Sequence, residues 1–466
     1  MTSSSAASLT PMQAGLRIPR GVAMLALAGS MCVVLLDSSM VNLAGRSIRD
    51  GLGLSAGELT GVVNAYLVAF AGLLLLGGRL ADVLGGRKVF LTGMALYVAA
   101  SVVCALAVNA PMLIAGRIGQ GAGAAIVIPS ALAIVLALYT TAAERTRALG
   151  TWGAVAGLGS LLGVSVGGLL TDAVGWQSVF WTPVPLGVIT GIVVWRSVPS
   201  IGGRPGRFDA LGAITITVAI SALALGMIAA SEVGWDSPVA VIGIVAGLAF
   251  LAAFVVVEHR SAHPLVPLGV FRRKPVATAG TVTLLLGATL SSLFFFLPLY
   301  QQDELGMSAL AAGMAQIPIA VSIIIASGLA PLLAQRVGVP NALRIALIVE
   351  LAGILWLTAN PATGLSVHLV GSFLLIGTGL GLGLVNATAM AVRDSADGEA
   401  GLLSGLVNAT QQLGGAIGLA ALAGIAIGAG GEHGDVAFTT AFLGASALLV
   451  IAFATTLLTK PDRATA

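Results

Sequence analysis

The chain has 466 residues, of which 57% are hydrophobic and 9% are charged. Because soluble proteins carry about 25% charged residues, this composition excludes an ordinary soluble enzyme and indicates a polytopic membrane protein. The net charge of +3 is small, and nothing in the sequence suggests a nucleic-acid-binding surface. The two cysteines, Cys32 and Cys104, lie in apolar runs and the four histidines are scattered, so we expect no disulfide, metal site or cofactor.

Fourteen apolar runs have about the length that a helix needs to cross a bilayer, which is ~20 residues. The sequence therefore predicts an all-α polytopic membrane protein with fourteen transmembrane helices. Their expected limits are 21–45, 59–80, 89–109, 111–138, 149–171, 180–198, 210–230, 238–258, 276–300, 309–334, 341–359, 366–392, 401–428 and 436–459.

Basic residues are distributed unevenly between the connecting segments. If the N-terminus lies inside, the inner segments carry nineteen of the 22 Lys and Arg, and the outer loops carry only Arg46 and Arg49. Because basic loops stay on the cytoplasmic side, we expect a multi-pass protein of the cytoplasmic membrane with both termini in the cytoplasm.

Two long inner connections, rich in Pro, Gly and Arg, divide the chain. A faint repeat supports the division, because Gly78–Gly85 (GRLADVLG) and Pro331–Gly338 (PLLAQRVG) share Leu, Ala and Gly at matched places. Duplicated six-helix halves are a common transporter plan. The expected organisation is a cytoplasmic tail at 1–20, a six-helix bundle at 21–198, a linker at 199–209, two extra helices at 210–258, a linker at 259–275, a second six-helix bundle at 276–459 and a tail at 460–466.

A basic residue, Arg117, stands inside the fourth apolar run. An arginine near the bilayer centre costs about 2.5–3.5 kcal/mol on insertion scales, so it normally faces the protein interior or a wet cavity. Asp37 in the first run lies at a similar depth, ~10 Å below the outer surface at 1.5 Å per residue. The two residues can therefore pair if their helices are neighbours. Alternatively, Arg117 extends to the nearby membrane surface.

A carboxylate held between a desolvating environment and a guanidinium can take or release a proton as its surroundings change. Asp37 and Arg117 are therefore candidates for proton coupling, and a static ion pair that locks two helices is the alternative. Asn42 and Gln120 on the same helices, and Tyr66 on the second, are further candidate substrate or proton-binding residues.

The eleventh run contains a carboxylate, Glu350, near its middle. It is either a second protonatable site, a contact for a cationic substrate, or a protonated side chain that is hydrogen-bonded to a neighbour. The twelfth and thirteenth runs carry four amides that could line a cavity or join helices: Asn386, Asn408, Gln411 and Gln412. None of the three lysines follows a glycine, so a GxxxxGK[ST] phosphate loop is absent and ATP hydrolysis by that route is excluded.

Four stretches together resemble signatures of the major facilitator superfamily. Gly78–Lys88 (GRLADVLGGRK) resembles the inner-loop signature GxLaDrxGrk, and Leu113–Ala125 (LIAGRIGQGAGAA) resembles the fourth-helix signature lxxxRxxqGxgaa. Leu36–Asn42 (LDSSMVN) resembles the first-helix signature LDxTIVN of drug–proton antiporters. Gly157–Leu170 resembles the fifth-helix antiporter signature, with Val164 where proline is usual. The likeness spans nearly the whole chain and indicates the fourteen-helix drug–proton antiporter branch.

The resemblance implies the major facilitator fold, with two six-helix bundles that rock about a central cavity and two extra helices between them. It implies export of drugs or antibiotics in exchange for protons, with Asp37 and Arg117 in proton coupling. An inner gate between the halves would contain Gly78, Asp82, Gly85, Arg87 and Lys88. The fifth helix would flex or pack tightly between the halves at Gly163, Gly167 and Gly168.

The leading hypothesis is thus a proton-coupled exporter of drug-like small molecules, acting as a monomer in the lipid bilayer. A proton-coupled metabolite or nutrient transporter of the same superfamily is the alternative, which Val164 leaves open. A membrane-embedded enzyme is a remote alternative, because we find no polar catalytic groups gathered at one membrane face.

Overall fold

The computed structural model describes residues 19–139, 141–199, 209–262, 264, 266, 268–359, 366–393, 400–430 and 436–458. In these residues every regular element is helical. The helices of the N-terminal half are α2 (Arg20–Leu43), α3 (Gly45–Leu52), α4 (Ala56–Leu84), α5 (Gly86–Ala105), α6 (Ala110–Leu138), α7 (Ala142–Val174), α8 (Gln177–Trp181) and α9 (Pro183–Ser197).

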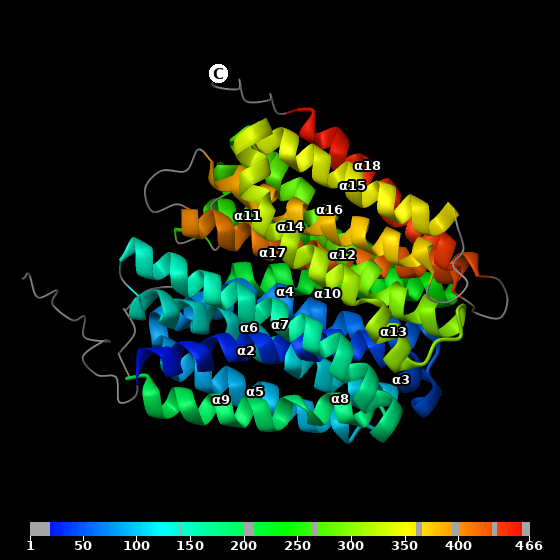
Figure 1. The fold of residues 1–466 in the computed structure, drawn as a ribbon, viewed down its shortest axis with the longest axis horizontal. Helices are drawn as coiled ribbons and strands as arrows, with labels where there is room; N and C mark the ends of the chain where they lie inside the picture. Colours follow the sequence, from blue (N-terminus) through cyan, green and yellow to red (C-terminus); the bar gives the residue numbers. More distant parts are fainter. Residues whose placement is uncertain are drawn as a thin grey trace, which may run out of the picture.

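Two further helices follow, α10 (Ala210–Val233) and α11 (Pro238–Arg260), and a short 3-10 helix, η1 (Leu268–Arg272). The helices of the C-terminal half are α12 (Lys274–Asp303), α13 (Ala309–Ala315), α14 (Ile317–Val337), α15 (Val339–Ala359), α16 (Val367–Val392), α17 (Ala400–Ala429) and α18 (Phe438–Thr456). Figure 1 shows the N-terminal half in the lower part of the view and the C-terminal half in the upper part.

Each predicted span coincides with a helix, although the sixth is divided into α8 and α9 and the tenth into α13 and α14. Twelve described stretches are long and apolar enough to cross a membrane. Two shorter apolar stretches, Ser165–Val174 in α7 and Leu211–Met227 in α10, lie at the fifth and seventh predicted spans. The all-α membrane architecture is confirmed, whereas the count of fourteen spans stays a prediction.

Side-chain caps and glycine turns set the helix ends. Ser55 and Glu58 form a capping box at the start of α4, where the Ser55 hydroxyl accepts from the Glu58 amide. Such reciprocal bonds satisfy two amides that the helix itself cannot. The inner turns after α4 and after α14 both pass through a glycine with positive φ, 94° at Gly85 and 81° at Gly338. Only glycine adopts this conformation without strain.

Glycines let α6 pack closely between α4 and α5. A Cβ at Gly121 would lie 2.4 Å from the Tyr66 carbonyl oxygen of α4, and one at Gly123 would lie 2.8 Å from the Tyr97 backbone nitrogen of α5. Small residues allow such backbone approach where lipid supplies no hydrophobic driving force. This packing brings the polar side chains of α6 against its neighbours.

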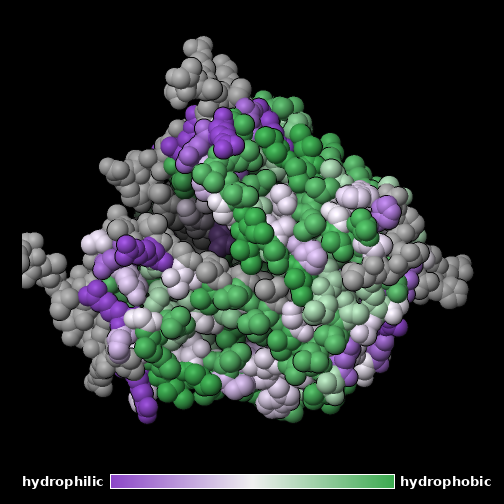
Figure 2. All heavy atoms as spheres, viewed as in Figure 1, coloured by the Kyte–Doolittle hydropathy of each residue, from purple (hydrophilic) through white to green (hydrophobic). Residues whose placement is uncertain are grey.

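The pair α10 and α11 lies beside the contact between the halves. Helix α10 packs against α4 of one half and α17 of the other, whereas α11 packs mainly against α10. The Thr217 hydroxyl of α10 shares its one proton between the Ala213 carbonyl of its own helix, at 2.7 Å, and the Gly72 carbonyl of α4, at 3.0 Å. Figure 2 shows hydrophobic residues over the middle of the visible face and a hollow between the two halves.

Candidate functional site

The start of α6 places Arg117 at the level of α2 and α4. The Asn109 side chain caps the helix by accepting a 2.9 Å hydrogen bond from the Met112 amide, and Pro111 occupies the first turn. Arg117 follows two turns later and is 1% exposed. Its side chain therefore remains inside the protein, and the alternative in which it extends to the membrane surface is wrong.

Arg117 meets Asp37 of α2 in the interior. Its Nη1 atom lies 3.0 Å from Asp37 Oδ2, and Asp37 is 0% exposed. The structure thus places the two charges in contact, as their matching depths predict. Their role in proton coupling stays a prediction.

The amide of Gln120 completes a closed polar network around this ion pair. Its Oε1 accepts from Arg117 at 2.9 Å, and its Nε2 donates to Asp37 Oδ1 at 3.2 Å and to Ser101 Oγ at 2.9 Å. The Tyr66 ring lies beneath the guanidinium, 4.4 Å from its Cζ. A buried pair is stable only when its remaining donors and acceptors are satisfied in this way.

A cavity of about 310 Å³ lies directly beside this network. Helices α2, α4 and α6 of one half and α12 and α17 of the other supply its walls. Arg117, Tyr66 and Asn42 line it, whereas Asp37 and Gln120 lie behind them. A change in the charge of Asp37 therefore affects the cavity through Arg117, the ion-pair partner that lines it.

Glu350, the carboxylate that the sequence places in the eleventh span, lies in the C-terminal half, away from the central ion pair. Glu350 of α15 is 0% exposed, and neither of its carboxyl oxygens has a hydrogen-bond partner among the described residues. Its backbone and Cβ pack so closely on α16 that a Cβ at Gly379 would lie 2.4 Å from the Glu350 Cβ. It does not line the central cavity. Its part as a second proton site stays a prediction.

The inner-gate residues lie at the turn between α4 and α5. The Arg87 guanidinium donates a 2.6 Å hydrogen bond to the Trp195 carbonyl of α9, in the same half, and Lys88 is exposed. Gly78 in α4 faces Pro129 of α6, at 3.6 Å from the position of an added Cβ. The Asp82 side chain lies outside what the structure describes. A contact of these residues across the halves stays a prediction.

The fifth-helix glycines lie in α7, at close contacts on two sides. Added Cβ atoms would lie 2.7 Å from the Leu36 carbonyl oxygen at Gly163 and 2.8 Å from Met40 at Gly167, both on α2. At Gly168 the Cβ would lie 2.6 Å from the Ala309 carbonyl oxygen of α13, in the other half. Helix α7 is therefore packed tightly against both halves toward its C-terminal end. The Val164 side chain is not among those described.

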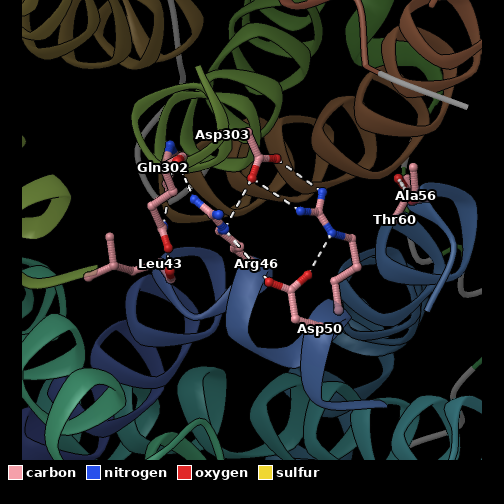
Figure 3. A network of polar contacts seen from close by, with 9 residues as sticks. Leu43, Arg46, Asp50, Ala56, Thr60, Gln302 and Asp303 are labelled. Atoms are coloured by element: carbon pink, nitrogen blue, oxygen red, sulfur yellow. Dashed lines mark hydrogen bonds and ion pairs between the residues drawn. The ribbon is translucent and has the colours of Figure 1, made fainter. Parts of the chain in front are cut away.

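An ion-pair cluster at the end of α12 joins the halves, and no sequence motif points to it. Asp303, the last residue of α12, lies between the guanidinium groups of Arg46 and Arg49 on α3, with N–O distances of 3.4 Å and 3.0 Å. Figure 3 shows Asp303 facing Arg46, with Asp50 on the opposite side. Arg46 also donates to the Gln302 carbonyl, and the Gln302 amide donates at 2.9 Å to the Leu43 carbonyl. We call Arg46, Arg49, Gln302 and Asp303 the outer latch, because the distribution of basic residues predicts that this end of the molecule faces outward.

The chemistry of the outer latch favours its charged form. Partial burial is the largest single influence on the pKa of Arg49 and lowers it, but the hydrogen bonds and charges of Asp303 and Asp50 together outweigh burial and hold this pKa above its usual value. The signal in the sequence was that the outer loops carry only two basic residues, both on α3. The sequence does not identify the partner of Arg49, because Asp303 lies 254 positions away along the chain.

Comparison with known proteins shows which family has this architecture. The model of the Major Facilitator Superfamily matches residues 27–215 and 206–419. The chain is 36% identical to the cephamycin export protein of Amycolatopsis lactamdurans over 93% of this chain and 91% of that protein. It is 34% identical to the lincomycin resistance protein of Streptomyces lincolnensis over 95% of this chain and 92% of that protein.

The fold has close counterparts among solved structures. A crystal structure of a POT family transporter matches with a TM-score of 0.71 at 12% identity, over 95% of this chain and 98% of that one. At such low identity the match shows the fold alone. Together, the helical architecture, the family model and the relatives show that this multi-pass membrane protein belongs to the major facilitator superfamily.

Proposed function

We propose that this protein is a proton-coupled antiporter that exports drug-like compounds or antibiotics across the cytoplasmic membrane by alternating access. The names of its relatives, a cephamycin export protein and a lincomycin resistance protein, support export of such compounds. The observation that carries the coupling is the buried Asp37–Arg117 pair, which adjoins a cavity between the halves.

Proton coupling follows from the two charge states of Asp37. When a proton from the outer side neutralises this carboxylate, its attraction for Arg117 weakens and the halves rearrange to face inward. The proton then leaves to the cytoplasm, the compound binds, and the loaded carrier turns outward. One charge that crosses 100 mV releases about 2.3 kcal/mol, which supports a roughly fifty-fold gradient.

The outer latch supplies the second part of alternating access. It joins α3 to the end of α12 and so holds the two halves together at the outer side. Release of the compound outward requires these contacts to separate. An inner gate at Asp82, Arg87 and Lys88 would take over in that state. The protein would work as a monomer with both termini in the cytoplasm.

The test is Asp37→Asn in vesicles with an imposed pH gradient. The amide keeps the shape of the side chain and a hydrogen-bond acceptor for Arg117, but it cannot titrate. We expect accumulation driven by the gradient to disappear, while exchange of labelled for unlabelled compound at equal pH persists.

Asp236→Asn is the matched control, because Asp236 is an exposed outer-loop residue and its replacement should leave accumulation unchanged. Accumulation by Asp37→Asn to the wild-type level would show that another group couples transport to protons. A net flux inward together with protons would instead favour the metabolite symporter.

A further inference from the structure

Seven polar side chains that line the central cavity are uncharged and make no hydrogen bond within the described part of the protein. Four of them are amides, from Asn42 on α2 and from Asn408, Gln411 and Gln412 on α17. Three are the hydroxyls of Ser38, Ser39 and Ser291. Among the described residues, none of these seven side chains makes a hydrogen bond within the protein. They are therefore available to a bound molecule, and each amide can donate two bonds and accept two.

The cavity wall has a single charged side chain, and its charge is compensated. Of the described residues that line the cavity, only Arg117 is charged. Asp37 holds this guanidinium from behind, with one oxygen bound to Arg117 and the other to Gln120. No described carboxylate lines the cavity, and Glu350 lies in the C-terminal half away from it. A cationic compound would thus find no counter-ion there.

The remainder of the wall is apolar and aromatic. Tyr66 and Phe70 stack along α4 with their rings 5.9 Å apart, and Phe294 faces the cavity from α12. Cavities that hold drug-sized molecules combine such surfaces with a few placed polar groups. The wall therefore suits a molecule with an apolar or aromatic part and several hydrogen-bonding groups.

We propose that this site takes uncharged compounds that carry amide or hydroxyl groups, and that it discriminates against permanent cations. The inference rests on the proposed export function and names its substrate class. A cation would lose its hydration without gaining a carboxylate partner, which is unfavourable in a buried site. An anion would compete with Asp37 for Arg117 and so favour protonation of Asp37. Proton and anion would then bind at the same time, whereas antiport requires that they bind in turn.

The test is binding to the purified full-length protein, measured by equilibrium dialysis at neutral pH. The probes are chloramphenicol, which is uncharged and carries an amide and two hydroxyl groups, and the protonated amine that remains when its acyl group is removed. Ethidium is the permanent cation. We expect chloramphenicol to bind at least about tenfold more tightly than either cation, a difference of about 1.4 kcal/mol.

A charge introduced into the cavity should reverse this preference. Asn408 lines the cavity and is exposed in the compound-free protein, so the carboxylate of Asn408→Asp stays hydrated until a compound binds. We expect ethidium to bind about tenfold more tightly to this variant, and chloramphenicol to bind more weakly. Gln177→Glu is the control, because it adds the same charge on the exposed outer surface and should change neither affinity.

Ethidium binding as tight as that of chloramphenicol in the wild-type protein would overturn the inference, as would the absence of chloramphenicol binding. Neither result would touch the proposed function, because a proton-driven export of cations in the vesicle assay would still confirm that function. Conversely, selective binding of chloramphenicol without proton-driven transport would leave the substrate class standing and refute the antiport.

Discussion

Asp303 binds Arg49 through two parallel hydrogen bonds of 3.0 Å and 3.1 Å, and this fork connects the end of α12 to α3. Paired bonds of this kind fix both the distance and the orientation of the groups they join. The residues belong to different halves of the molecule. Their separation is therefore a direct measure of whether the two halves meet at this end of the molecule.

Asp303→Asn should shift the protein toward the outward-open state. The substitution removes the charge that Arg46 and Arg49 share across the two halves, whereas Asp50, their other carboxylate partner, lies on α3 itself. Partly exposed ion pairs contribute about 0.2–1 kcal/mol each. We expect the population of the state in which the outer latch is formed to fall a few-fold. Ser39→Cys in a background without Cys32 and Cys104 reports this change, because a membrane-impermeant maleimide added outside should label it faster.

Glu304→Gln is the matched control, since Glu304 is the neighbouring exposed carboxylate and makes no ion pair with another described residue. Its labelling rate should equal that of the parent. Equal rates in the Asp303→Asn and Glu304→Gln proteins would mean that the outer latch does not hold the halves together.

Loss of one partner of the central ion pair should cost more stability than loss of both. Arg117→Leu leaves a fully buried carboxylate that keeps only uncharged partners, chiefly the Gln120 amide, and broken buried pairs cost about 3–5 kcal/mol. The double substitution Asp37→Leu with Arg117→Leu removes both charges, so we expect it to restore part of this loss. Thermal unfolding midpoints in detergent would show the order wild type, double variant, Arg117→Leu. A double variant that is less stable than the single one would contradict the account.

A side chain at Gly168 should prevent closure of the outer side. Its Cβ would lie 2.6 Å from the Ala309 carbonyl oxygen, so Gly168→Val forces α7 and α13 apart at their contact between the halves. We expect a folded protein that binds its compound but transports it several-fold more slowly. Leu169→Val, at the adjacent exposed position, should transport normally. Wild-type rates in Gly168→Val would show that these helices need not meet.

Glu350→Gln should lower the accumulation ratio without abolishing transport. The amide has the same size as the acid, and the carboxyl oxygens have no described partner to lose, so the variant should fold. If Glu350 binds a second proton, the concentration ratio reached at a given pH gradient falls when this group is removed. An unchanged ratio would assign Glu350 a purely structural role.

The sequence predicted the helices well because bilayer thickness sets both their length and their apolar character. It also predicted the Asp37–Arg117 contact, since two opposite charges at one depth in an apolar medium have few other partners. It did not predict that Asn408, Gln411 and Gln412 share a cavity with Asn42, because these residues lie on helices whose contact depends on the packing of the two halves. The partner of Arg49 was hidden for the same reason.

The hydrogen bond from Thr217 to Gly72 has a mechanical consequence. Helix α10 also packs against α17 in the opposite half, so it could not keep both neighbours if the halves change their angle as proposed. The Thr217 bond favours α4 as the neighbour that α10 would keep, and α11 would move with α10 because it packs mainly against that helix. The N-terminal moving unit would then be larger than the C-terminal one by the α10–α11 hairpin. Helix α17 would slide along α10.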